Sequence, residues 1–182
     1  MATLIDVASA EDVLPVYRDS PIERLLRYHN LGEPRPDGMG GAELFIAMCI
    51  DNRKALDLPN EFAFVLRTAG ARLDGNEFEL TYAVAVGGVA AVALIGHTDC
   101  GMAHVMAKRD AFVAGLVERG HVEPGAASAH FDAHAPGYAI AGPVEFTLDQ
   151  AAMVRTHLPG LLVAPLLYRV EDGRLVQIAA SE

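Results

Sequence analysis

The sequence predicts an α/β fold in which a central, mostly parallel β-sheet is flanked by helices. Short apolar runs that suit buried strands alternate along the chain with longer stretches of helical spacing. Each strand-like run in the first half of the chain also ends in a cluster of polar residues. Ligands of open parallel sheets bind beyond the carboxyl ends of the strands, so these clusters are the expected place for a functional site.

The N-terminal region is expected to form a helical arm. Charged and apolar positions alternate at roughly helical spacing over residues 11–30, and Ser20-Pro21 is a typical helix start. The residues that follow are too rich in glycine and proline for a regular element. We assign residues 1–40 to a helical arm and linker. The length of 182 residues suits one core, which predicts a single domain over residues 1–182.

Three buried strands are expected before residue 100, each rich in apolar residues. They cover residues 43–48, 62–66 and 89–95. A helix is predicted over residues 77–86, and the Gly87-Gly88 pair separates it from the third strand. The pattern is strand, helix, strand, which favours parallel pairing.

The second half continues the alternation. Apolar spacing predicts a helix over residues 102–118, directly after the third polar cluster, whereas residues 120–143 are too rich in Gly, Ala and Pro to assign. The remaining expected elements are a helix over residues 145–157, a strand over 161–170, a tight turn at 171–173 and a strand over 174–178.

Composition and charge exclude several classes of partner. The net charge is -10, with 14 basic against 24 acidic residues, so a nucleic acid or an anionic membrane is not an expected partner. The most apolar stretch, residues 82–95, is too short to span a bilayer. The N-terminus has no secretory pattern, and we therefore expect a cytoplasmic protein with reduced thiols.

Cys49 and Cys100 are the only two cysteines, and each lies in one of the polar clusters. Two thiolates with the imidazole of His97 form a ligand set that zinc prefers, with the fourth position left for water. Such an open zinc site is catalytic. The competing interpretation is that both cysteines are small buried hydrophobic residues and that His97 is an ordinary loop histidine.

Asp51 and Arg53 follow Cys49 at alternate positions and project from the same side of an extended segment. The guanidinium can keep the carboxylate ionised, and the carboxylate can orient a nucleophile beside the metal. The competing interpretation is a solvated surface pair.

Together these residues resemble a known family. Cys49-x-Asp51-x-Arg53, then Arg67-x-Ala69-Gly70, then His97-x-x-Cys100-Gly101 is similar to the β-class carbonic anhydrases, most closely over residues 43–102. The resemblance implies a β-carbonic anhydrase-like fold and a Zn2+ cofactor on Cys49, His97 and Cys100. It also implies a catalytic pair, Asp51 and Arg53, and substrate-pocket residues Arg67, Ala69, Gly70 and Gly101.

The implied reaction is that of a zinc lyase, the reversible hydration of carbon dioxide to bicarbonate by hydroxide held on zinc. Asp51 would orient the nucleophile, and in a closed form it would bind the metal itself. The chain departs from the family pattern at Ile50, Asn52, Thr68 and Ala71, of which none is a ligand.

The resemblance also implies a homodimer, with the N-terminal arm wrapped on the partner and the site near the interface, or a homotetramer. Two alternative functions stay open. A hydrolase of carbonyl sulfide or carbon disulfide would act on linear isosteres of carbon dioxide with the same scaffold. A non-catalytic zinc-binding regulatory protein would use Asp51 to close the coordination sphere permanently.

Overall fold

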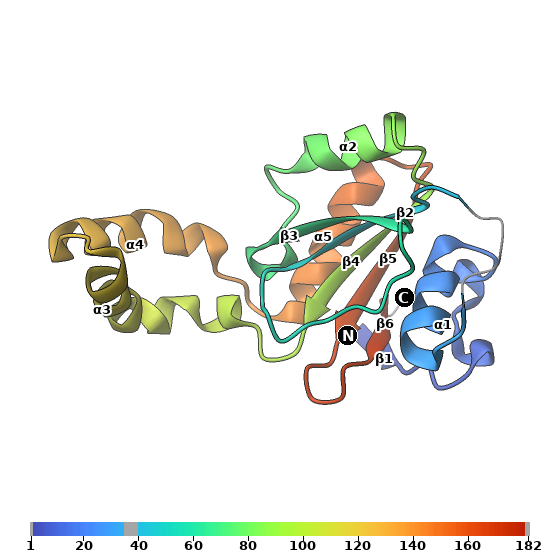
Figure 1. Ribbon diagram of the computed structural model, residues 1–182, viewed down its shortest axis with the longest axis horizontal. Coiled ribbons are helices and arrows are strands. Elements are labelled where there is room, and N and C mark those ends of the chain that lie inside the picture. Colours follow the sequence, from blue (N-terminus) through green and yellow to red (C-terminus); the bar gives the residue numbers. More distant parts are fainter. Residues whose placement is uncertain (1, 35–39, 181–182) are drawn as a thin grey trace.

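A six-stranded mixed sheet forms the centre of the molecule in a computed structural model that describes residues 2–34 and 40–180 (Figure 1). The strand order is β1-β6-β5-β4-β2-β3. Their bounds are Ala2–Ile5 (β1), Leu44–Cys49 (β2), Ala63–Thr68 (β3), Ala91–His97 (β4), Leu162–Tyr168 (β5) and Leu175–Ala180 (β6). Strands β3, β2, β4 and β5 are parallel to one another, while β6 pairs antiparallel with both β5 and β1. The predicted mostly parallel sheet is confirmed.

The protein has five described α-helices, of which three cover the two faces of the sheet. Their bounds are Pro21–Leu31 (α1), Glu77–Ala85 (α2), Arg109–Gly120 (α3), Pro124–Tyr138 (α4) and Pro143–His157 (α5). Every residue of β2 and β4 is buried. Because side chains point alternately to the two faces of a sheet, both faces of these strands are covered. One face of these strands packs against α1, and the other packs against α2 and α5. At Gly96 in β4, a Cβ atom would lie 2.3 Å from Thr147 Oγ1, which explains the glycine where α5 crosses the strand.

The N-terminal segment, predicted as a helical arm, contains helix α1 and packs on the sheet of its own protomer. Residues 2–5 form edge strand β1, which sequence reasoning missed, and α1 buries Ile22, Leu25 and Leu26 against β2, β4 and β5. Ser20 caps α1 by accepting hydrogen bonds from the N–H groups of Ile22 and Glu23. The apolar face of α1 is therefore buried within the protomer. Part of the expected linker, residues 35–39, lies outside the described residues.

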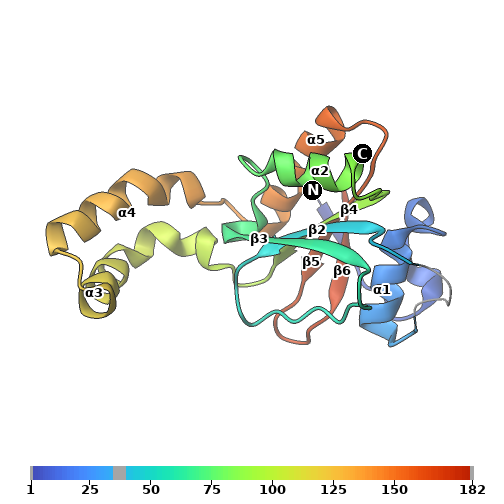
Figure 2. The ribbon, with the colours of Figure 1, turned by 45° about the horizontal axis from the view of Figure 1, so that its top comes forward.

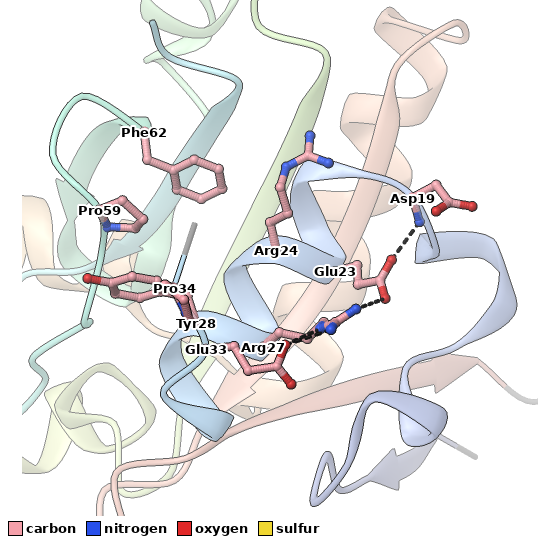
Figure 3. A pocket seen from close by; sticks show the side chains of 9 residues that line it. All are labelled: Asp19, Glu23, Arg24, Arg27, Tyr28, Glu33, Pro34, Pro59 and Phe62. Carbon is pink, nitrogen blue, oxygen red and sulfur yellow. Dashed lines mark hydrogen bonds and ion pairs between the residues drawn. The ribbon is translucent and has the colours of Figure 1, made fainter. Parts of the chain in front are cut away.

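A small cavity of about 230 Å³ lies between α1 and the turn before β3 (Figure 3). Charged side chains line it, and they pair among themselves: Arg27 contacts both Glu23 and Glu33. Phe62, on its wall, directly precedes β3, whereas the polar clusters follow the other ends of the strands. The cavity is therefore remote from the predicted site.

The segment between β4 and α5 forms a helical hairpin that projects from the sheet. It begins with the 3-10 segment Gly101–Lys108 (η4), continues as α3 and returns as α4, and both views show the two arms side by side (Figures 1 and 2). Phe112 of α3 packs against Phe131 of α4 within the hairpin. The helix expected over residues 102–118 is therefore divided, and α4 forms in the stretch that the sequence left unassigned. No described helix has the length and apolar character needed to cross a membrane.

Candidate metal centre

The carboxyl ends of β2 and β4 bring the three predicted ligands together. The strands are parallel neighbours, with Met48 opposite Ile95, so Cys49 and His97 leave the sheet side by side. The chain then turns after β4 and returns Cys100 to the same place. The ligand atoms of Cys49, His97 and Cys100 all lie within 4.8 Å of one another, and all three residues are buried.

The imidazole of His97 is oriented for a metal. Its Nδ1 lies 2.9 Å from the backbone oxygen of Thr98, and because a carbonyl only accepts, Nδ1 carries the hydrogen. In the neutral ring, Nε2 then presents a lone pair. Nε2 is completely buried and has no hydrogen-bond partner among the described residues. A buried nitrogen without a partner, beside two sulfur atoms, fits a bound zinc ion.

The two cysteines are buried and form no disulfide. A hydrogen bond from Cys100 lowers the pKa of the Cys49 thiol well below its usual range, and the same bond raises the pKa of the Cys100 thiol. The backbone N–H of Gly70 also donates to Cys49 Sγ at 3.3 Å. Gly70 has φ 74°, a left-handed conformation that glycine adopts without strain. In the absence of a metal, the hydrogen bond between the two cysteines favours the thiolate at Cys49 and the thiol at Cys100.

This arrangement predicts that zinc binding releases a proton from Cys100 near neutral pH. Because the pKa of Cys100 is raised, the proton is bound in the metal-free protein and must leave for the sulfur to ligate. Zinc affinity should therefore rise with pH, by about tenfold per unit for one released proton. Calorimetric titration with Zn2+ in buffers of different ionisation enthalpy measures the protons released. A binding constant independent of pH would contradict a ligating Cys100.

Asp51 and Arg53 form the predicted pair at the edge of this cluster. Arg53 Nη2 lies 2.7 Å from Asp51 Oδ2, and Arg53 Nε donates to Asp51 Oδ1 at 3.1 Å. This two-point contact lowers the pKa of the Asp51 carboxyl below its usual range. Asp51 Oδ2 is also 3.9 Å from His97 Nε2. The carboxylate is thus ionised, paired with arginine and adjacent to the ligand cluster.

The other predicted pocket residues have different positions. Arg67 donates to the backbone oxygens of Asp51 at 3.4 Å and Lys54 at 3.2 Å, so it holds the loop after β2. Gly70 contacts Cys49 Sγ, as described above. Ala69 lines a neighbouring cleft, and Gly101 begins η4 directly after Cys100.

Sequence reasoning missed two charged residues near the cluster. Lys54 is 3% exposed, and its Nζ donates to the backbone oxygen of Cys49 at 3.3 Å; burial lowers its pKa. Asp99 accepts a hydrogen bond from Arg53 Nη1 at 2.7 Å. Both residues are adjacent in sequence to members of the predicted site, and that proximity was the available signal. Ile140 packs against Cys49 and Cys100 from far along the chain, and nothing in the sequence indicated it.

Comparison with known proteins agrees with this geometry. A family model described as carbonic anhydrase matches residues 44–175, which is more than half of the chain and includes all three predicted ligand residues. The chain belongs to the β-class carbonic anhydrase family. No match is found among curated protein sequences.

Solved structures share the fold of this β-class carbonic anhydrase family member. A carbonic anhydrase from Glaciozyma antarctica has 24% identity and a TM-score of 0.55, over 92% of this chain and 97% of that chain. A β-carbonic anhydrase from Trichomonas vaginalis has 20% identity and a TM-score of 0.61, over 80% and 86%. The apo form of a carbon disulfide hydrolase has 20% identity and a TM-score of 0.55, over 89% and 90%. At these identities, the structures establish the fold alone.

Proposed function

We propose that the protein is a zinc-dependent carbonic anhydrase that hydrates carbon dioxide reversibly to bicarbonate. The observation that carries the proposal is the buried cluster of Cys49, His97 and Cys100 beside the Asp51–Arg53 pair. Two thiolates and an imidazole would hold the zinc ion. Zinc bound in an open site lowers the pKa of water to about 7, so that a hydroxide nucleophile is available at neutral pH.

Asp51 orients the nucleophile in this proposal. Because Arg53 lowers the pKa of the Asp51 carboxyl, the group is ionised at neutral pH and can accept a hydrogen bond from the attacking group. Accepting that bond turns a lone pair toward the carbon of the substrate. Arg53 holds Asp51 in place, and Arg67 holds the loop that carries both.

An apolar substrate is consistent with the surroundings of the cluster. Met102, Ala103 and Phe146 pack beside the two cysteines and Ile140. A cleft of about 780 Å³ adjoins this packing; Ala69, Met102 and apolar residues of the helical hairpin line the part beside it, and polar side chains such as Arg72 and Asp74 line another part. Carbon dioxide carries no charge and makes few hydrogen bonds, so such walls admit it more readily than they admit ions.

Carbonyl sulfide and carbon disulfide are the second candidate substrates. Both are linear and apolar like carbon dioxide, and one structure of similar fold is a carbon disulfide hydrolase. The cleft does not discriminate among these molecules by charge. A non-catalytic zinc protein is the third candidate, but the contact of Asp51 with Arg53 favours an open site over one that Asp51 closes.

The test is stopped-flow hydration of carbon dioxide across pH, with zinc content measured on the same sample and the chelator-treated protein as control. Rapid turnover that requires zinc supports the proposal, and a steep rise at alkaline pH would indicate a closed site. Turnover of carbonyl sulfide or carbon disulfide should be compared on the same preparation. Bound zinc without turnover of any of the three substrates would contradict an enzymatic role.

We further propose that the chain is one domain, since its single sheet takes strands from both ends of the described chain, and that it assembles as a homodimer. Edge strand β3 and helix α2 expose Phe64, Val65, Phe78, Tyr82 and Val86. All of these except Val86 line a largely apolar groove of about 420 Å³. Pairs of such dimers would give a tetramer.

Phe78→Glu is expected to weaken the dimer by about tenfold or more, because an aromatic side chain that is 75% exposed in the protomer would be replaced by a charge in the interface. Sedimentation velocity at several concentrations measures the change. Val16→Glu is the matched control, since Val16 is 64% exposed on the N-terminal segment and lies outside the proposed interface. Equal effects of the two substitutions would contradict this interface.

A further inference from the structure

Arg53 is held from two sides. Its Nε and Nη2 groups contact Asp51, as described above. On the other side, Nη1 donates to Asp99 Oδ2 at 2.7 Å and Nη2 donates to the backbone oxygen of Asp99 at 2.9 Å. The guanidinium therefore bridges two aspartates, of which Asp51 has a carboxylate oxygen 3.9 Å from His97 Nε2.

Asp99 adopts an unusual backbone conformation to make these contacts. Its φ is 53°, in the left-handed region that residues other than glycine seldom adopt. Its side chain is 73% exposed, and an exposed ion pair of this kind contributes little to the stability of a fold. Strain of this type is concentrated at functional sites. The conformation directs both the carbonyl and the carboxylate of Asp99 toward Arg53.

The turn that carries Asp99 is fixed to the sheet. The Thr98 backbone N–H donates to the oxygen of Tyr168 at 3.1 Å, and Thr98 Oγ1 donates to Glu171 at 2.8 Å. Thr98 Oγ1 also accepts from the Val170 N–H at 2.9 Å. Asp99 is therefore part of a rigid turn, and the long Arg53 side chain is the movable member of the pair.

Asp51 has a second position within reach. Two ligands of a tetrahedral zinc ion, each about 2.0 Å from the metal, lie about 3.3 Å apart. Asp51 Oδ2 is 3.9 Å from His97 Nε2, so a small rotation would make the carboxylate a ligand. The contact of Asp51 with Arg53 opposes that rotation. This contact persists only while the Arg53 side chain stays in its present position.

We propose that Asp99 is a positioning residue that anchors Arg53 and thereby keeps Asp51 off the metal. The inference rests on the proposed function, in which Asp51 must be free to orient the nucleophile. Without the anchor, the guanidinium can swing toward solvent, and Asp51 then closes the site. Asp99 touches neither the metal ligands nor the substrate through its side chain, so it acts only through Arg53.

The experiment uses the cobalt-substituted full-length protein, because the visible absorption of Co2+ changes when a carboxylate joins its ligands. Asp99→Asn removes the charge and tolerates the left-handed backbone, while Asp99→Gly keeps the backbone and removes the side chain. We expect both variants to shift the cobalt spectrum and to lower kcat by about tenfold. The double variant Asp51→Asn with Asp99→Asn should have the spectrum of Asp51→Asn alone.

Asp172→Asn is the matched control, since Asp172 forms an equally short, exposed pair with Arg169 at 2.7 Å. Its spectrum and turnover should equal those of the unmodified protein. Wild-type spectra in both Asp99 variants would overturn the inference, as would a spectral shift that persists without the Asp51 carboxylate. The cobalt spectrum is read without turnover, so failure to hydrate carbon dioxide would contradict the proposed function and leave this result separately interpretable.

Discussion

Cys100→Ala is expected to abolish stoichiometric zinc binding and, with it, all turnover. Removal of this sulfur leaves Cys49 and His97 as the two remaining ligands of the cluster, and two ligands cannot hold zinc in the geometry of a catalytic site. The thiolate of Cys49 also loses the hydrogen bond that lowers its pKa most, so its pKa should rise toward the usual value. Metal analysis of the purified variant after dialysis, together with stopped-flow hydration of carbon dioxide, measures both effects.

Ile140→Val is the matched control for this prediction. Ile140 belongs to the same buried cluster as Cys49 and Cys100, and the substitution alters packing without removing a ligand. Each substitution should cost about 1 kcal/mol of the free energy of unfolding of the metal-free protein, as truncations of buried residues commonly do. Only Cys100→Ala should lose zinc. Stoichiometric zinc in that variant would remove Cys100 from the ligand set.

The strands and the ligand cluster were predictable because both depend on local patterns. The runs that became β2, β3 and β4 are short, apolar and bounded by polar residues, so the strands themselves followed from sequence alone. Burial was predictable for β2 and β4, whereas β3 lies at the edge of the sheet and exposes Phe64 and Val65. Parallel neighbouring strands end at the same edge of a sheet, which placed Cys49 and His97 together before any coordinates were known. The Asp51–Arg53 pair followed from residue spacing in the same way.

The errors occurred where a partner lies far along the chain. Strand β1 is four residues long and exists through its pairing with β6, about 175 residues away. The sequence shows that α1 has an apolar face but not that this face covers the protomer's own sheet. Gly, Ala and Pro in α4 argued against a helix, yet Phe131 and two alanines pack in the hairpin and override that local preference.

Asp99 illustrates a different limit of sequence reasoning. It lies between two predicted ligands in the printed sequence, but its contact with Arg53 depends on a left-handed turn that residue identity alone does not predict. This turn is held by contacts between Thr98 and the β5–β6 connection. Charged residues around a metal centre are visible in sequence, whereas which of them pair is decided by the fold.

Asp51→Ala is expected to retain zinc and to lose most turnover, by about 100-fold. The three ligand atoms do not include the carboxylate, so metal content should stay stoichiometric. What is lost is the acceptor that orients the nucleophile, and that loss should reduce kcat rather than weaken substrate binding. Asp51→Asn keeps the shape of the side chain and removes its charge. If hydrogen-bond acceptance alone is required, the kcat of this variant should lie between that of the unmodified protein and that of Asp51→Ala.

Asp132→Asn is the control for charge removal from an aspartate–arginine pair. Asp132 binds Arg109 through two contacts of 2.7 Å on the helical hairpin, which matches the bidentate geometry of Asp51 away from the cluster. It should keep both zinc and turnover. Full activity of Asp51→Ala would remove Asp51 from the mechanism, and loss of zinc in that variant would instead make the carboxylate a ligand.

The double variant Asp51→Ala with Arg53→Ala tests whether the two residues act as one unit. Because Arg53 is already left without its partner in Asp51→Ala, the added Arg53→Ala substitution should then cause little further loss of turnover.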